Sequence, residues 1–125
     1  MKLKISCWVQ AIFYFVLGAN HFIDPEAYFE LIPPYFKFPV FFNIVAGAAE
    51  MLLSIGLVFN KTRKLATYGI IAMLVTFITS HVHFIQIGSC IEGGLCVPEW
   101  LAWIRLVFIH PLLIYWVWSV RNLQT

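Results

Sequence analysis

Charged side chains are scarce in this 125-residue chain. Asp, Glu, Lys and Arg make up 11% of the residues, whereas a typical soluble domain has about 25%. Hydrophobic residues make up 62%, and the mean hydropathy is +0.86. A water-soluble fold of this size could not cover so much apolar surface. The composition therefore predicts an integral membrane protein, and the length indicates a single transmembrane domain over residues 1–125.

Sequence features of several function classes are also missing. The net charge is only +2 and no basic block with interleaved aromatics is present, so nucleic acid is not an expected partner. The chain has no Gly-rich phosphate loop, no C-x-x-C-H haem motif and no nucleophile beside a general base. With no catalytic motif, an enzymatic role is at most that of an accessory subunit in a redox system.

Four long apolar runs fill most of the sequence. Each has about 20 residues, and at a rise of about 1.5 Å per residue such a helix crosses a hydrocarbon core of about 30 Å. We therefore predict an all-α fold, a membrane-spanning antiparallel four-helix bundle that the lipid bilayer surrounds. Its helices are expected at about residues 3–23, 40–59, 65–87 and 100–120.

Basic residues gather on one side of this predicted bundle. Lys37 is the one basic loop residue on the opposite side, and Arg105 lies within a helix. Because positive charge stays on the cytoplasmic side, both termini are expected in the cytoplasm. We expect a multi-pass protein of the bacterial plasma (inner) membrane. The basic residues of the cytoplasmic side are Lys2, Lys4, Lys61, Arg63, Lys64 and Arg121.

Cys90 and Cys96 lie together in the loop between the third and fourth runs. The predicted topology places this loop in an oxidising compartment, where a disulfide is permitted. A structural disulfide is the interpretation we adopt. A redox-active or metal-binding pair and two free thiols are the alternatives, although the spacing is not the C-x-x-C of thiol oxidoreductases.

A polar face is expected on the second helix. Asn43, Gly47, Glu50 and Ser54 recur at steps of four, three and four residues, which places them on one side of a helix. Glu50 lies near the membrane midplane, where an unpaired carboxylate is costly. Either it forms an interhelical hydrogen bond or ion pair that stabilises the bundle, or it carries protons or binds a ligand.

The third and fourth helices contribute further ionisable groups. His81 and His83 point about 160° apart on a regular helix, so only one of them is expected to face the bundle interior. Arg105 and His110 are about 140° apart by the same geometry. Pro111 follows His110 and is expected to loosen the helix there, because proline removes one backbone donor.

The depths of these residues suggest how they assemble. Glu50 and His110 are expected to meet near the middle, and His21 to lie nearer the outer surface, about 10 Å from Glu50. This spacing favours a ladder of ligand-binding or proton-relay groups over a single metal centre. A structural polar network is the other interpretation, and a metal site of Glu50, His110 and His81 is a weaker one. The expected ladder contains Glu50, His110, Arg105, His81, His83 and His21.

The ordered set of motifs resembles the DoxX-like family of small four-helix membrane proteins. Two departures from that family are Thr79–His81 and His110-Pro111, which make this interior more titratable. The resemblance implies a four-helix membrane fold, and relatives include a subunit associated with thiosulfate:quinone oxidoreduction and a component of a redox-stress complex. The motifs that carry it are Gly18–Phe22 with Pro25, Pro33–Pro39, Gly47–Glu50, Thr62–Ala66 with Gly69, and Leu112–Trp118.

These observations lead to one functional hypothesis and two alternatives. The hypothesis is a membrane redox accessory that binds a quinone or another apolar ligand in the bundle, where Glu50, His110 and Arg105 can hydrogen-bond a carbonyl oxygen. The first alternative is a non-catalytic assembly factor or structural partner of another membrane protein. The second is a proton or small-solute pathway, which requires a homo-oligomer because four helices enclose little volume.

The charge asymmetry predicts a topology that reporter fusions can measure. A fluorescent protein fused after Thr125 should fluoresce and alkaline phosphatase at the same position should be inactive, because that end is cytoplasmic. Both readouts should reverse for fusions in the loop that carries Cys90 and Cys96. An active phosphatase at the C-terminus would contradict the assignment.

Overall fold

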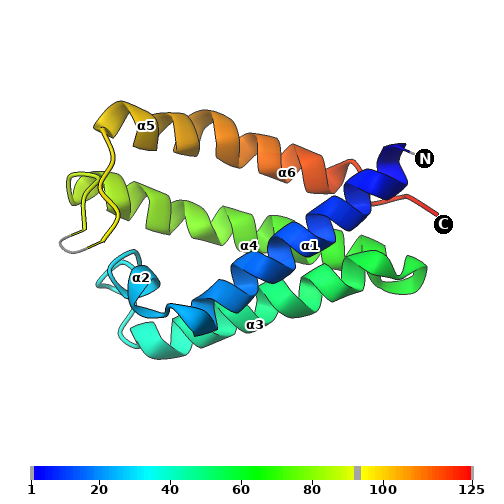
Figure 1. Cartoon of the computed structure of the whole chain (residues 1–125), viewed down its shortest axis with the longest axis horizontal. Coiled ribbons are helices and arrows are strands. Elements are labelled where there is room, and N and C mark those ends of the chain that lie inside the picture. The colour runs from blue at the N-terminus through cyan, green and yellow to red at the C-terminus, as the bar shows by residue number, and fades with distance from the viewer. Residues whose placement is uncertain (1, 92–93, 125) are drawn as a thin grey trace.

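The computed structural model describes residues 2–91 and 94–124, in which four long helical segments lie side by side (Figure 1). Both chain ends lie at one end of the molecule, called the termini end below, and α2 lies at the opposite end, called the loop end. The elements in chain order are α1 (Lys2–Ile23), α2 (Glu26–Phe29), α3 (Pro39–Val58), α4 (Asn60–Gln86), α5 (Glu99–Ile104), the π-helical segment η1 (Arg105–Ile109) and α6 (His110–Trp118).

Each long segment has the length and composition of a membrane span, and α5, η1 and α6 together form the fourth, Glu99–Trp118. Large apolar side chains are exposed along all four, among them Ile12, Leu52, Val75 and Phe108. A contiguous apolar surface of this extent is unfavourable in water and is stabilised by hydrocarbon. The all-α fold with four long apolar helices packed together is thus confirmed, and its four candidate spans suggest a multi-pass membrane protein.

The connection between α3 and α4 is tighter than the sequence predicted. Phe59 alone separates the two helices, in an extended conformation with φ −101° and ψ 133°. The expected start of the third span at residue 65 is therefore wrong, because α4 begins at Asn60. Polar residues that the hydropathy pattern assigns to a loop form the first turn of this helix instead.

Arg63 explains why that turn is helical. Its guanidinium is buried and donates hydrogen bonds to the carbonyl oxygens of Leu57 (2.8 Å) and Val58 (3.0 Å) at the end of α3. These are carbonyls that a helix end leaves without intrahelical partners. A further bond to the carbonyl of Leu123 holds the C-terminal segment against the same turn.

The most extensive helix contact joins α1 and α3, where two glycines face each other. A Cβ atom added to Gly18 would lie 2.8 Å from the backbone oxygen of Gly47, and one added to Gly47 would lie 3.0 Å from the oxygen of Gly18. Small residues allow this approach of two backbones in membranes. The crossing brings the next inward-facing residues of both helices, His21 and Glu50, close together.

The fourth span contains a wide turn just before Pro111. The amide of His110 donates to the carbonyl of Arg105, five residues earlier, which is the π-helical pattern. Proline lacks an amide hydrogen and its ring crowds the carbonyl of the fourth residue before it, so the regular ladder is interrupted there. A turn that closes on the fifth residue also makes the angle between the side chains of Arg105 and His110 smaller than the 140° expected for an α-helix.

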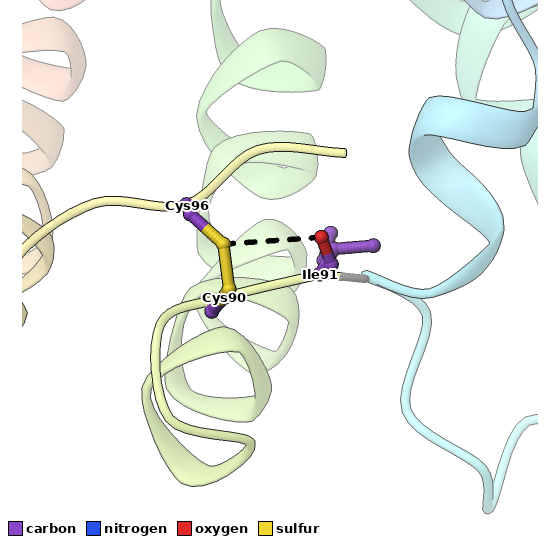
Figure 2. Close-up of a disulfide and its surroundings, with 3 residues drawn as sticks. All are labelled: Cys90, Ile91 and Cys96. Atoms are coloured by element: carbon purple, nitrogen blue, oxygen red, sulfur yellow. Dashed lines mark hydrogen bonds between the residues drawn. A yellow bond between two sulfur atoms is a disulfide. The ribbon is translucent and has the colours of Figure 1, made fainter. Parts of the chain in front are cut away.

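The loop between α4 and α5 contains a disulfide that joins Cys90 to Cys96 (Figure 2). Ile91, next to Cys90, donates its amide to the carbonyl of Leu95 at 2.9 Å. The sulfur of Cys96 lies 3.9 Å from the carbonyl oxygen of Ile91. Ile91 itself packs with Phe84 of α4 in a small apolar cluster at the loop end.

The larger apolar core occupies the termini half of the bundle. There the indole of Trp116 donates to the hydroxyl of Ser6 at 2.7 Å, and Gln10 donates to the carbonyl of Trp116 at 3.2 Å, so α6 is held against α1. The loop half, by contrast, holds most of the polar groups described below. The core consists of Cys7, Ala11, Tyr14, Leu57, Ala66, Ile70, Met73, Leu74, Val117 and Val120.

The close contact of α1 and α3 at Gly18 and Gly47 predicts which glycine substitutions destabilise the bundle. Gly18→Ala should lower the free energy of unfolding by about 1–3 kcal/mol, because its methyl group meets backbone that no rotamer change can move. Gly69→Ala is the control, since its methyl group meets only the flexible end of Leu53. Unfolding in mild detergent by SDS titration measures both. Equal stability of the two variants would contradict the close crossing.

Candidate functional site

A cavity of about 290 Å³ lies in the loop half of the bundle. Residues of α1, α2, α3, α4 and η1 line it, together with the segment that follows α2. Most of the wall is apolar, and its ionisable groups are His21, Tyr28, His81 and Arg105. The other lining residues are Leu31, Ile32, Pro33, Phe36, Phe42, Asn43, Val45, Ala46, Ala49, Met73, Thr76, Phe77, Thr79 and Ser80.

Asn43 determines the protonation of one nitrogen of His21. Its side-chain nitrogen donates to the backbone carbonyl of His21 at 2.9 Å, which turns its oxygen toward Nδ1 of the same residue at 2.6 Å. An amide oxygen can only accept, so the hydrogen-bond network assigns a proton to Nδ1. The other ring nitrogen, Nε2, is then directed to α3.

Nε2 of His21 lies 3.0 Å from Oε2 of Glu50, and both side chains are buried. The two atoms are within ion-pair distance, although their alignment is not that of a hydrogen bond. A histidine and a carboxyl group with two protons between them, one of these on Nδ1, form a pair without net charge. A neutral pair is the arrangement that a low-dielectric interior favours.

The expected separation of about 10 Å between His21 and Glu50 is therefore wrong. That estimate used the rise of the backbone alone. Side chains of a helix tilt toward its N-terminus, and α1 and α3 run in opposite directions. His21 therefore tilts toward the termini end and Glu50 toward the loop end, so the two side chains converge.

Tyr28 closes the site over His21. The two rings stack with centroids 3.8 Å apart and planes inclined by 20°. Asn20 donates to the Tyr28 hydroxyl at 2.8 Å, which leaves the hydroxyl its own hydrogen for another acceptor. The segment between α1 and α3 thus folds back over the cavity and fills one of its walls.

His110 forms its hydrogen bond with α4 and not with the pair of His21 and Glu50. Its Nε2 lies 2.5 Å from the carbonyl oxygen of Leu74, so this nitrogen carries a proton. Its ring also meets that of His81 edge to face, with centroids 4.7 Å apart. The expected meeting of Glu50 and His110 is replaced by two separate contacts, His21 with Glu50 and His81 with His110.

Arg105 and His81 face the same cavity. Within the described part of the chain, neither the guanidinium of Arg105 nor the ring nitrogens of His81 have a hydrogen-bond or ion-pair partner. The π-helical turn accounts for the position of Arg105, because it brings this residue and His110 toward α4. Both side chains are half-buried, and a polar group that lacks a partner inside a protein is uncommon and calls for an explanation such as a functional role.

His83 and the two loop cysteines lie outside this arrangement. His83 is half-buried but is not among the residues that line the cavity. Neither Cys90 nor Cys96 lines it. Across residues 2–91 and 94–124, no three His, Cys, Asp or Glu side chains come close enough together to hold a metal ion, so the weaker interpretation of a site made by Glu50, His110 and His81 finds no support.

Two residues of the site were missed as site residues by the sequence argument. Asn43 was assigned to the polar face of the second helix, and its step of seven residues from Glu50 was the available signal. Tyr28 had no such signal, because it belongs to a short helix whose position follows from how the loop folds back. Both lie against His21.

The pair of His21 and Glu50 can be tested by a double-mutant cycle. Glu50→Leu should lower the free energy of unfolding by about 1–3 kcal/mol, because Nε2 of His21 is left buried without a partner. Adding His21→Leu should cost less than it does in the wild type, since the partner is already gone. SDS titration of the four proteins measures this coupling, and strictly additive effects would contradict the contact.

Comparison with known proteins adds one finding. A search of curated proteins and a search of solved structures returned no match. The resemblance to the DoxX-like family is not confirmed by these comparisons. The sequence does match the family model described as domain of unknown function DUF8561, over residues 10–121. Because this match covers nearly the whole chain, the protein belongs to the DUF8561 family.

Proposed function

We propose that this protein binds a lipid-soluble small molecule, whose polar end is held in the cavity of the loop half. The observation that carries the proposal is the cavity itself, an apolar space into which a few polar side chains converge. This combination is typical of small-molecule sites in proteins. Arg105 and His81 support the proposal, because neither has a hydrogen-bond partner among the described residues. Ionisable groups within membrane spans are energetically costly and commonly mark functional sites.

The size of the cavity suits the head of a ligand and the first part of its chain. Its volume of about 290 Å³ lies just below the range of about 300–1,000 Å³ that ligand pockets enclose. Aromatic side chains from two directions, Phe36 and Phe77, form part of the wall. The remainder of a longer molecule would lie outside the cavity, among the lipid chains.

An entrance from the bilayer is available between α3 and α4. Val45 and Thr76 both line the cavity and are both exposed on the surface of the bundle. Phe42, at the loop end of α3, likewise lines the cavity and is exposed over 36% of its surface. A ligand dissolved in the membrane can thus enter sideways without passing through water.

Hydrogen-bond donors in the cavity indicate a ligand whose polar end carries oxygen acceptors. Arg105 offers N–H groups and Tyr28 an O–H group that the rest of the described chain does not use. Quinones, with their carbonyl oxygens, belong to this class, as do amphiphiles with acidic heads. If the ligand is a quinone, the protein is an accessory of a membrane redox system. In a bacterium such a system lies in the plasma membrane.

Filling the cavity should remove the ligand. In Ala46→Phe the new ring occupies space that Ala46 now lines, and the affinity for a co-purifying lipid-soluble molecule should fall by about tenfold or more. Solvent extraction of the purified protein followed by mass spectrometry measures the bound molecule. Ala72→Phe is the matched control, because Ala72 is exposed on α4 and does not line the cavity.

Three results are informative. A molecule recovered from the wild type and from Ala72→Phe, and lost from Ala46→Phe, supports the proposal. The same extract from all three proteins, or a clean extract from the wild type together with no response to any added lipid-soluble probe, contradicts it.

A further inference from the structure

We propose that the molecule bound in this cavity is an anionic amphiphile, whose carboxylate or phosphate head pairs with Arg105 and whose chain extends along the apolar wall. The proposal rests on the function proposed above and names the ligand class of the same site. A neutral ligand is the alternative that the experiment below distinguishes.

The charge balance of the cavity carries the argument. Its lining contains one permanent cation, Arg105, and no Asp or Glu. Glu50, a buried acidic side chain of α3, is not among the lining residues and lies 3.0 Å from Nε2 of His21. Across residues 2–91 and 94–124 that ion pair is the single one present, so no acidic side chain in this part of the chain pairs with Arg105.

A guanidinium within the apolar part of a membrane is stabilised by pairing with an anion. In a low-dielectric site an uncompensated charge is costly, whereas pairing with a hydrogen-bonded anion offsets most of that cost. A neutral carbonyl oxygen accepts a hydrogen bond but leaves the positive charge unbalanced. An anionic head satisfies both requirements, and the planar fork of Arg105 matches the two oxygens of a carboxylate or phosphate.

Neighbouring groups suit the same head. Tyr28 lines the cavity and retains its hydroxyl hydrogen for an acceptor, because Asn20 already donates to its oxygen. His81 lines it as well, with ring nitrogens that no other described residue engages. Donors from α2 and η1 can therefore bind one anionic group from two sides.

The remaining wall suits a hydrocarbon chain. Leu31 and Ile32 from the segment after α2, with Phe77 from α4, present apolar surface next to the polar groups. The exposed pair of Val45 and Thr76 marks where such a chain would leave the bundle for the bilayer. The head thus lies inside the protein and the tail among lipid chains, as in an ordinary membrane amphiphile.

The experiment compares an anionic amphiphile with its neutral ester and with a quinone. Protein stripped of lipid is placed in a neutral detergent at an alkaline pH at which a fatty acid is ionised. Binding of oleate, of methyl oleate and of decylubiquinone is measured by thermal stabilisation and native mass spectrometry. Oleate should bind about tenfold or more tightly than methyl oleate, since one charge-assisted pair is worth at least that much.

Variants assign the effect to the residue. Arg105→Gln should remove the preference for oleate over methyl oleate, and Arg105→Lys should retain part of it. Arg121→Gln is the matched control, because Arg121 lies at the termini end over the ring of Trp118 and should keep the preference intact. The comparison of oleate with its ester in the wild type tests the proposal even if Arg105→Gln does not fold.

The two proposals fail in different ways. Equal binding of oleate and methyl oleate, or tighter binding of decylubiquinone, overturns the anionic ligand and leaves the lipid-soluble ligand standing. No binding of any probe, with Ala46→Phe indistinguishable from the wild type, overturns both. A preference for oleate that Arg105→Gln and Arg121→Gln reduce equally would show a general surface effect and also overturns the assignment.

Discussion

The backbones of α1 and α3 approach each other at Gly18 and Gly47 more closely than any side chain would permit. This contact sets the spacing at which His21 and Glu50 meet, and the opposite directions of the two helices turn those side chains toward each other. Without it a histidine and a carboxyl would each face hydrocarbon alone, which is strongly unfavourable. The same helix crossing therefore packs α1 against α3 and brings two buried ionisable side chains together.

The polar groups divide into those that the protein satisfies itself and those that it does not. His21, Asn43 and Glu50 form one set of contacts, and His110 is held by the carbonyl of Leu74. Arg105 remains outside both sets, although it faces the same cavity. A cavity that is lined by an arginine and by no acidic side chain differs from a purely structural polar network, in which every member has a partner.

The π-helical turn shows how a local backbone feature changes a site. Pro111 signals an interruption in the sequence, but not how the chain will absorb it. Widening the turn from Arg105 to His110 alters the angle between their side chains, so two residues that a regular helix keeps apart both approach α4. Turns of this kind are often found at functional sites.

Composition and the length of the apolar runs were sufficient to predict four long apolar helices, because the thickness of hydrocarbon sets the length expected of a span. The spacing of Asn43, Gly47, Glu50 and Ser54 likewise predicted a face that the structure buries. Partner choice was beyond such reasoning. Whether Glu50 meets His21 or His110, and whether His81 or His83 reaches the cavity, depends on helix crossings, side-chain tilt and a π-helical turn. These are properties of helices packed against one another, and a periodicity within a single helix does not contain them.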